Sequence, residues 1–206
     1  MGKSAPSWEE IFSLYNTIKY YYALSEETDS DLQTNLQPLN EFRAGLDHLM
    51  RIIAIERLSE YKDYDVEDEK KKLYGHLSRA FFDISDLLSI HYRRRINKAL
   101  KKYSVNEIQT AIPEYYSKIQ PRIAEMEKIF AEYRTEKRFP KSSEGEASVD
   151  TYSRLIVELS DYYQTVIKAI PALNEVKRKG RIPGALLWGI PVLIAIVEIV
   201  IGVVLR

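Results

Sequence analysis

Apolar and polar residues follow a helical period along most of the chain. Between residues 38 and 58, apolar side chains recur at intervals of three and four positions: Leu39, Phe42, Leu46, Leu49 and Ile53. This spacing places them on one stripe of an α-helix, which a globular protein buries against a neighbouring element. No stretch alternates between apolar and polar residues for long enough to form a sheet, and we find no internal repeat. The pattern therefore predicts an all-α fold.

Start and stop signals divide this pattern into about five helices. Ser7 followed by Glu10 has the spacing of a capping box. Asp65 and Ser104 are the predicted N-caps of the third and fourth helices. Pro171 is expected to interrupt the last helix, because proline lacks the N–H that an inner helical turn needs. The predicted helices cover residues 7–24, 38–58, 65–103, 104–136 and 149–180, with loops at 25–36 and 137–148. Residues 1–180 are thus expected to form an antiparallel helical bundle.

The C-terminal segment differs from the rest of the chain. The 22 residues of Gly184–Leu205 carry a single charge, Glu198. As a helix they would span about 33 Å, enough to cross a hydrocarbon core of about 30 Å. Four bases stand just before this segment: Lys177, Arg178, Lys179 and Arg181. The positive-inside rule then places the body on the cytoplasmic side, and residues 1–6 lack the apolar core of a signal peptide. We expect residues 181–206 to form one transmembrane helix; the alternative is a buried helix that ends a soluble domain.

Composition narrows the possible chemistry. The chain has 30 Lys and Arg, 30 Asp and Glu, and no Cys. The absence of Cys excludes disulfides, thiol nucleophiles and Cys-ligated zinc or iron–sulfur sites. The sequence contains no phosphate-binding loop, dinucleotide fingerprint, H-E-x-x-H or G-x-S-x-G motif. We therefore expect a protein that is not an enzyme and that holds no metal and no cofactor.

Two of the three histidines stand beside arginines on helices predicted to form the core. His48 lies between Arg43 and Arg51, and His76 is three residues before Arg79. An Arg and a His facing one pocket can hold a phosphate and move a proton. Buried charges are costly unless they are paired, so a structural network between helices is the alternative. In that alternative, Asp47 forms an i,i+4 ladder of ion pairs with Arg43 and Arg51, each four positions away, and neutralises both.

The R-x-x-x-x-H element formed by Arg43 and His48, on an all-helical chain, resembles the HEPN superfamily. The active members of this superfamily cut RNA, so the resemblance implies Arg43 and His48 as the catalytic pair of a ribonuclease. Ala44 stands where that motif usually has a polar residue. HEPN-like bundles joined to membrane helices resemble accessory effectors of bacterial antiphage systems, including the membrane partner of some RNA-targeting CRISPR systems. The overall plan is also similar to the channel effector of the Hailong system. These resemblances imply a homo-oligomer around a central pore in the bacterial inner membrane.

A basic stretch closes the third predicted helix. Residues 91–102 contain six Lys and Arg and no acidic residue. Four of them share one helix face: Arg94, Lys98, Lys101 and Lys102. This face can bind the phosphates of a nucleotide or oligonucleotide. The alternative is a solvated face whose charge suits the C-terminal end of a helix.

Glu198 is the one carboxylate inside the apolar segment. A carboxylate in the bilayer costs a few kcal/mol, roughly 2.5–3.5 on insertion scales for Asp. Associated copies would relieve this cost if Glu198 faced a water-filled lumen, where a ring of carboxylates favours cations. Ala195 and Gly202 lie at i−3 and i+4 and allow close helix approach, and Pro191 falls on the same side. The alternative is a passive anchor in which Glu198 snorkels to the far interface.

Taken together, the residues and the resemblances predict an oligomeric membrane effector in antiphage defence. Its C-terminal helices would form an ion-conducting pore, gated by a nucleotide or oligonucleotide signal or by a partner. A tail-anchored ribonuclease and a non-catalytic membrane-anchored scaffold are the two alternatives.

Overall fold

The computed structural model describes residues 4–28, 36–58, 63–135 and 144–180. These residues form six α-helices: α1 (Trp8–Thr28), α2 (Leu36–Ile53), α3 (Val66–Leu100), α4 (Val105–Ala111), α5 (Gln120–Thr135) and α6 (Glu144–Gly180). Two π-helical segments, Ala54–Leu58 and Tyr115–Ile119, continue α2 and precede α5. The predicted all-α bundle is therefore confirmed for the described part of the chain, with six helices where about five were expected.

The predicted N-caps are present. The backbone N–H of Glu10 donates to the Ser7 hydroxyl at 3.1 Å, and Asp65 accepts from the N–H of Glu67. Ser104 forms a complete capping box with Glu107. Short polar motifs thus fix these three helix starts, because each cap satisfies an N–H that has no partner within its helix.

The Ser104 cap allows a local test of stability. We expect Ser104→Ala to lower the free energy of unfolding by about 1 kcal/mol, because an N–H at the start of α4 loses its acceptor. Urea unfolding followed by circular dichroism measures this change. Ser117→Ala, at an exposed serine in the Tyr115–Ile119 segment, is the matched control. An equal change in both variants would contradict the role of the cap.

Two predicted breaks are wrong. α1 continues to Thr28, through the start of the predicted loop, because Ser25 and Thr28 turn their hydroxyls back to carbonyls of the preceding turn and stay buried. α6 runs through Pro171 without interruption. The carbonyl four residues before a proline loses its N–H partner; here it belongs to Ile167, which is exposed along with Pro171, so water can take its place. α6 also begins at Glu144, five residues before the predicted start.

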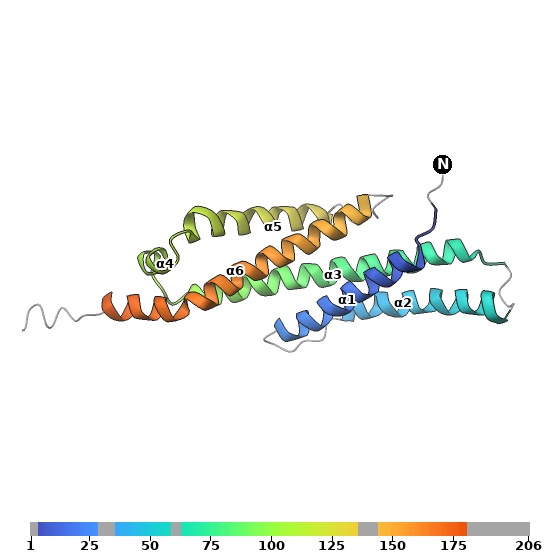
Figure 1. Ribbon diagram of the computed structural model, residues 1–206, viewed down its shortest axis with the longest axis horizontal. Helices are drawn as coiled ribbons and strands as arrows, with labels where there is room; N and C mark the ends of the chain where they lie inside the picture. Colours follow the sequence, from blue (N-terminus) through green and yellow to red (C-terminus); the bar gives the residue numbers. More distant parts are fainter. Residues whose placement is uncertain (1–3, 29–35, 59–62, 136–143, 181–206) are drawn as a thin grey trace, which may run out of the picture.

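α3 is the central element of the bundle. It packs against α1, α2 and α6, and Figure 1 shows it running along most of the molecule, with α1 and α2 beside its N-terminal half. α6 follows the other half, and α5 lies on the outer side of α6 (Figure 1). The Arg122 guanidinium of α5 binds both carboxylate oxygens of Glu158 on α6, each at 2.9 Å.

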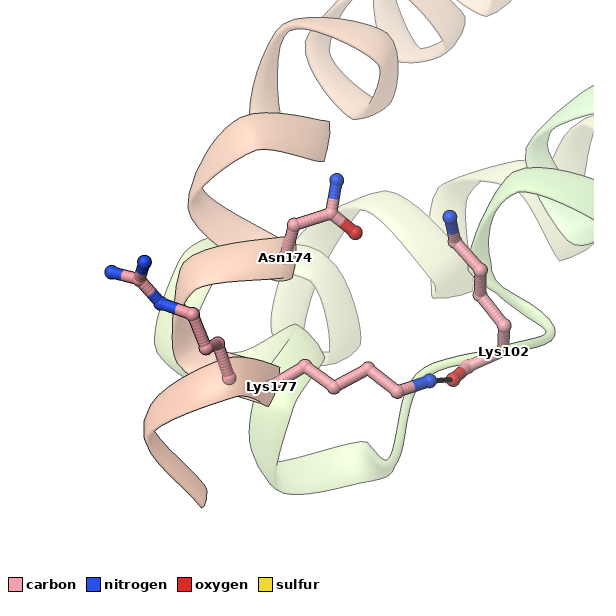
Figure 2. A pocket seen from close by; sticks show the side chains of 4 residues that line it. Lys102, Asn174 and Lys177 are labelled. Atoms are coloured by element: carbon pink, nitrogen blue, oxygen red, sulfur yellow. Dashed lines mark hydrogen bonds between the residues drawn. The ribbon is translucent and has the colours of Figure 1, made fainter. Parts of the chain in front are cut away.

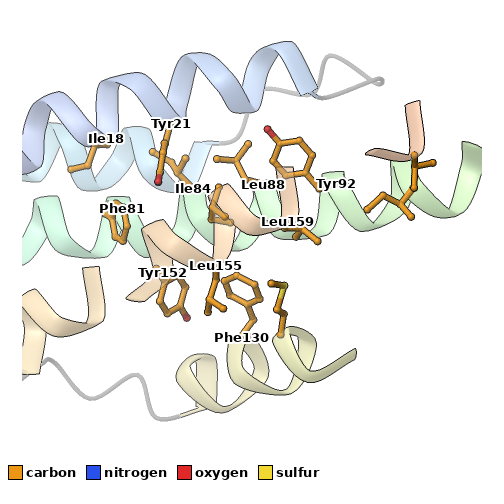
Figure 3. Packing of buried hydrophobic residues seen from close by; sticks show 14 of the residues in the cluster. Ile18, Tyr21, Phe81, Ile84, Leu88, Tyr92, Phe130, Tyr152, Leu155 and Leu159 are labelled. Atoms are coloured by element: carbon orange, nitrogen blue, oxygen red, sulfur yellow. The ribbon is translucent and has the colours of Figure 1, made fainter. Parts of the chain in front are cut away.

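The hydrophobic core extends along α3. Phe81, Ile84 and Leu88 of α3 are fully buried, and Ile18 and Tyr21 of α1 lie on one side of them (Figure 3). On the other side lie side chains of α5 and α6, which include Phe130, Tyr152, Leu155 and Leu159 (Figure 3). One helix therefore carries the packing of both halves of the molecule.

The apolar stripe predicted on α2 is only partly buried. Phe42 and Leu49 pack against the core, but Leu39, Leu46 and Ile53 are 39%, 54% and 41% exposed. α2 faces α3 with a neighbouring line of positions, seven residues apart: Pro38, Gly45 and Ile52. A Cβ on Gly45 would lie 3.4 Å from Leu73 of α3, so the small residue sets the close approach of the two helices.

The predicted transmembrane segment, with Pro191, Ala195, Glu198 and Gly202, lies outside the described residues. Within residues 4–28, 36–58, 63–135 and 144–180, no helix is both long enough and apolar enough to cross a membrane.

Candidate functional site

His48 binds a buried carboxylate of the neighbouring helix. Its Nδ1 donates to Glu69 Oε2 at 2.6 Å, and the Glu69 side chain is only 1% exposed. Lys72 donates to the other oxygen at 2.9 Å, and an Arg51 nitrogen lies 3.5 Å from Oε2. Glu69 therefore stays charged in the interior because three positive or donating groups surround it.

His76 has an equivalent arrangement. Its Nδ1 donates to Glu41 Oε2 at 2.8 Å, and Arg79 Nε donates to the same oxygen at 2.7 Å. Each histidine of one helix is thus paired with a glutamate of the other. The pairs 48–69 and 41–76 run in opposite directions along α2 and α3, which confirms that these two helices are antiparallel.

The two histidine–glutamate arrangements come from a repeated sequence motif. Residues 41–51 and 69–79 share E-x-x-x-x-x-x-H-L-x-R, so the expectation of no internal repeat is wrong for this short element. In an antiparallel helix pair, two copies of the motif meet with pseudo-two-fold symmetry, and each glutamate meets the histidine and arginine of the other copy.

The two imidazoles stack at the centre of this cluster. The ring centroids of His48 and His76 are 5.2 Å apart and the planes differ by 25°. A metal ion lies in the plane of each imidazole that binds it, about 2.0 Å from the nitrogen, so two nearly parallel rings at this separation do not converge on one ion. The described residues also contain no group of three His, Cys, Asp or Glu that could hold a metal.

Cations and hydrogen-bond donors compensate both glutamates of the cluster. Burial raises the pKa of Glu41, but hydrogen bonds from Arg79 and His76 outweigh it, and its pKa lies below the ordinary value. The pKa of Glu69 is lowered in the same way, with burial opposed by His48 and Lys72. Both glutamates are therefore charged and already paired. This geometry favours the structural alternative for His48, Arg51, His76 and Arg79, because an anion would have to compete with two carboxylates.

Arg43 does not join this cluster. It is exposed, and a separation of five residues rotates it about 140° around the helix from His48. The predicted ladder through Asp47 is also not formed, since Arg43 and Asp47 make no ion pair with each other or with any other described residue, and Arg51 pairs with Glu69. The structure therefore does not bring Arg43 and His48 together within one chain.

A second candidate site lies where α3 and α6 end. The hydroxyl of Tyr103, a buried residue just after α3, donates to Asn174 Oδ1 of α6 at 2.6 Å. The ammonium groups of Lys102 and Lys177 lie 5.0 and 5.2 Å from the Tyr103 ring centroid, within the range of a cation–π contact. Lys177 also donates to the backbone carbonyl of Lys102 (Figure 2). These contacts join the C-terminal end of α3 to the C-terminal end of α6, 75 residues further along the chain.

A cavity of about 490 Å³ opens at this junction, and its described lining residues are Lys102, Asn174, Lys177 and Arg178. None of the four is acidic, and the nearby Glu175 pairs with Lys179 at 2.8 Å. Figure 2 shows Asn174 and Lys177 on α6 and Lys102 across from them. We call these four residues and their cavity the basic end.

Comparisons of this chain with protein-family models, with curated proteins and with solved structures find no match. The all-helical fold is therefore established without a family, and the HEPN resemblance stays a prediction.

The rest of the predicted basic face extends from the basic end along α3. Arg94, Lys98 and Lys101 are exposed and make no ion pair within the described chain. Arg93, which was not predicted as a site residue, instead pairs with Glu127 of α5 at 2.6 Å. The face therefore offers several cations that the described protein does not neutralise.

Sequence reasoning missed Glu41, Glu69 and the α6 half of the basic end as site residues. The repeated motif could have identified the two glutamates as partners of the histidines. Lys177 and Arg178 were predicted only as the bases that precede a membrane segment, because no sequence pattern shows that α6 ends beside α3.

Proposed function

We propose that the chain is an oligomeric membrane effector of antiphage defence. Residues 184–205 cross the membrane and assemble into an ion-conducting pore, and the helical body gates it in response to a nucleotide or oligonucleotide. The observation that carries this proposal is the basic end. It gathers Lys102, Lys177 and Arg178 around one cavity, and Arg178 stands six residues before the apolar segment begins at Gly184.

The chemistry of the basic end suits a polyphosphate ligand. Lysine and arginine bind phosphate through charge-assisted hydrogen bonds, and Asn174 adds an amide that can donate to a ribose or a base. Lys98 and Lys101 extend the positive charge along α3, so a ligand longer than one nucleotide gains further contacts. Anionic lipid headgroups offer the same phosphate chemistry to this surface.

Gating follows from the position of the basic end. A ligand there touches the last turns of α6, which lead directly into residues 181–206. It opens the pore only if it binds the open arrangement more tightly than the closed one. In that open arrangement, copies of Glu198 line the lumen and favour cations, and Pro191, Ala195 and Gly202 shape the helix contacts.

The α2–α3 cluster supports the effector over the tail-anchored ribonuclease. His48 is held by Glu69 and stacked on His76, and Arg43 points away from it. The two residues that the ribonuclease would use as its catalytic pair therefore lie apart within one chain.

Removing charge from the basic end tests this proposal. We expect the triple variant Lys102→Gln, Lys177→Gln and Arg178→Gln to bind a fluorescent single-stranded oligonucleotide at least about tenfold more weakly, since each lost phosphate contact is worth about 1.5 kcal/mol or more. Fluorescence anisotropy on the full-length protein in detergent measures the affinity.

The matched control changes three exposed lysines on other surfaces, Lys19, Lys71 and Lys128, to glutamine. It removes the same total charge but leaves the cavity intact. Equal weakening in both variants would mean that only net charge matters, and unchanged binding in the first variant would place the ligand elsewhere.

A further inference from the structure

α2 carries a second apolar stripe that faces away from α3. Its positions follow 3-4-3-4-3 spacing, the pattern of a coiled-coil seam: Leu36, Leu39, Arg43, Leu46, Met50 and Ile53. The five apolar members are 39% to 65% exposed. We call these six residues the outer stripe. A solvent-facing seam of this regularity marks an interaction surface.

The outer stripe borders an apolar groove. A groove of about 760 Å³ lies between α1 and α2, with Leu73 and Leu77 of α3 in its lining. Trp8, Phe12 and Tyr15 line it from α1, and all three are at least 41% exposed. Leu46 belongs to both the groove and the outer stripe, so the two surfaces are continuous.

We propose that the outer stripe pairs with the outer stripe of a second copy of this chain, with the two α2 helices antiparallel. The seam then pairs Leu36 with Ile53, Leu39 with Met50 and Arg43 with Leu46 of the other copy. Such an interface is isologous, because every contact occurs twice around a two-fold axis between residues 44 and 45.

Charge selects the antiparallel orientation. Arg43 is the one cation in the seam, and in a parallel pair it would face Arg43 of the second copy. In the antiparallel pair it lies beside Asp47 of the second copy, since Arg43 and Asp47 are about one and a half and two and a half positions from the axis, an offset of about 1.5 Å along the helix. Arg43 and Asp47 are exposed and unpaired within the described chain, so each is available to neutralise the other across the interface.

The pairing has a consequence for gating, which rests on the proposed function. From the two-fold axis to Lys102 is about 44 Å along α3, so the two basic ends lie on opposite sides of the dimer, on the order of 90 Å apart. The last turns of α6, which lead into the apolar segments, are then far apart within one dimer. The antiparallel dimer is therefore a resting form, and the pore assembles from chains whose outer stripes have separated.

Cysteine cross-linking tests the pairing in the full-length protein in detergent, because the natural chain has no cysteine. We expect a mixture of Leu39→Cys and Met50→Cys chains to form a disulfide dimer under a copper–phenanthroline oxidant. Either variant alone should cross-link at least about fivefold less, because its two cysteines would be about 16 Å apart, beyond disulfide reach. Val157→Cys, exposed on α6, is the control and should not cross-link.

The outcomes separate the possibilities. If each variant alone cross-links as readily as the mixture, the contact is parallel or non-specific and the proposal is overturned. The absence of cross-links in the mixture would also overturn it. We also expect Arg43→Asp or Asp47→Arg alone to weaken the dimer, and the double variant to restore it.

Ion flux from the cross-linked mixture in liposomes tests the resting form. We expect flux to be suppressed until a reductant is added. Unchanged flux in the cross-linked state would overturn the resting form but leave the pairing, whereas a wild-type protein that never conducts would count against the pore alone.

Discussion

Replacing Glu69 with glutamine is expected to lower the free energy of unfolding by about 3 kcal/mol. The Glu69 carboxylate is 1% exposed and accepts from His48 and Lys72. Glutamine keeps the shape but removes the charge, so the buried side chain no longer offers the carboxylate to which His48 and Lys72 donate. Hydrogen bonds to a charged group are worth about 1.5–3 kcal/mol each, and losing two of them accounts for a change of this size. Chemical unfolding of the full-length protein, followed by circular dichroism, measures the change.

The matched control is Glu67→Gln, two residues earlier on α3. Glu67 is 54% exposed and pairs only with Lys70, at 3.2 Å. Surface pairs of this kind contribute between zero and about 1 kcal/mol. Equal losses in the two variants would contradict the assignment of Glu69 as the buried centre of the α2–α3 contact.

The same variant should change the response to acid. The folded-state pKa of Glu69 lies below its ordinary value of 4.5, so the folded state binds this proton less readily than the unfolded chain. The stability that Glu69 contributes is therefore fully present above about pH 4.5 and is lost as the pH falls through the lowered pKa. Glu69→Gln lacks this contribution, and its stability should depend less on pH in that range.

Replacing Glu198 with leucine is expected to reduce ion flux through liposomes at least tenfold. In the proposed pore Glu198 supplies the only charge within the apolar segment, and a ring of these carboxylates lowers the barrier for cations. Leucine also removes the cost of placing a carboxylate in the bilayer, so the variant should insert at least as well as the wild type.

The control for this variant is Glu56→Gln, at an exposed carboxylate in the Ala54–Leu58 segment. It removes one charge from the body and should leave flux unchanged. Equal flux from wild type and Glu198→Leu would argue that Glu198 does not line a conducting path and would favour the passive anchor.

Local signals predicted much of the fold. Ser7, Asp65 and Ser104 each mark a helix start through contacts within three residues, so sequence spacing alone is enough. Pro171 shows the limit of such signals. Its cost to a helix depends on whether the released carbonyl reaches water, and exposure is a property of the folded bundle.

The candidate sites depend on contacts that sequence spacing does not give directly. The glutamates that bind His48 and His76 lie 21 and 35 residues away, so their pairing requires the register of α2 against α3. The repeated motif contains that register, because only an antiparallel pair lets two copies satisfy each other. Nothing comparable in the sequence joins Lys102 to Lys177.

The stripe on α2 was predicted as one buried surface. Residues spaced by three and four cover a wide arc of a helix. The part of that arc that faces α3 depends on small residues such as Gly45, because they allow the two helices to approach closely. Phe42 and Leu49 therefore turn inward, and Leu46 turns outward. That division is what leaves a seam free for a second chain.

The most direct test of the central claim is oligonucleotide-triggered ion flux from the full-length protein in liposomes. The wild type is measured beside the triple variant of Lys102, Lys177 and Arg178. We predict that a single-stranded oligonucleotide raises flux in the wild type and has no effect on the variant. Equal responses from the two proteins, or a wild type that stays silent at every oligonucleotide concentration, would contradict a pore gated from the basic end.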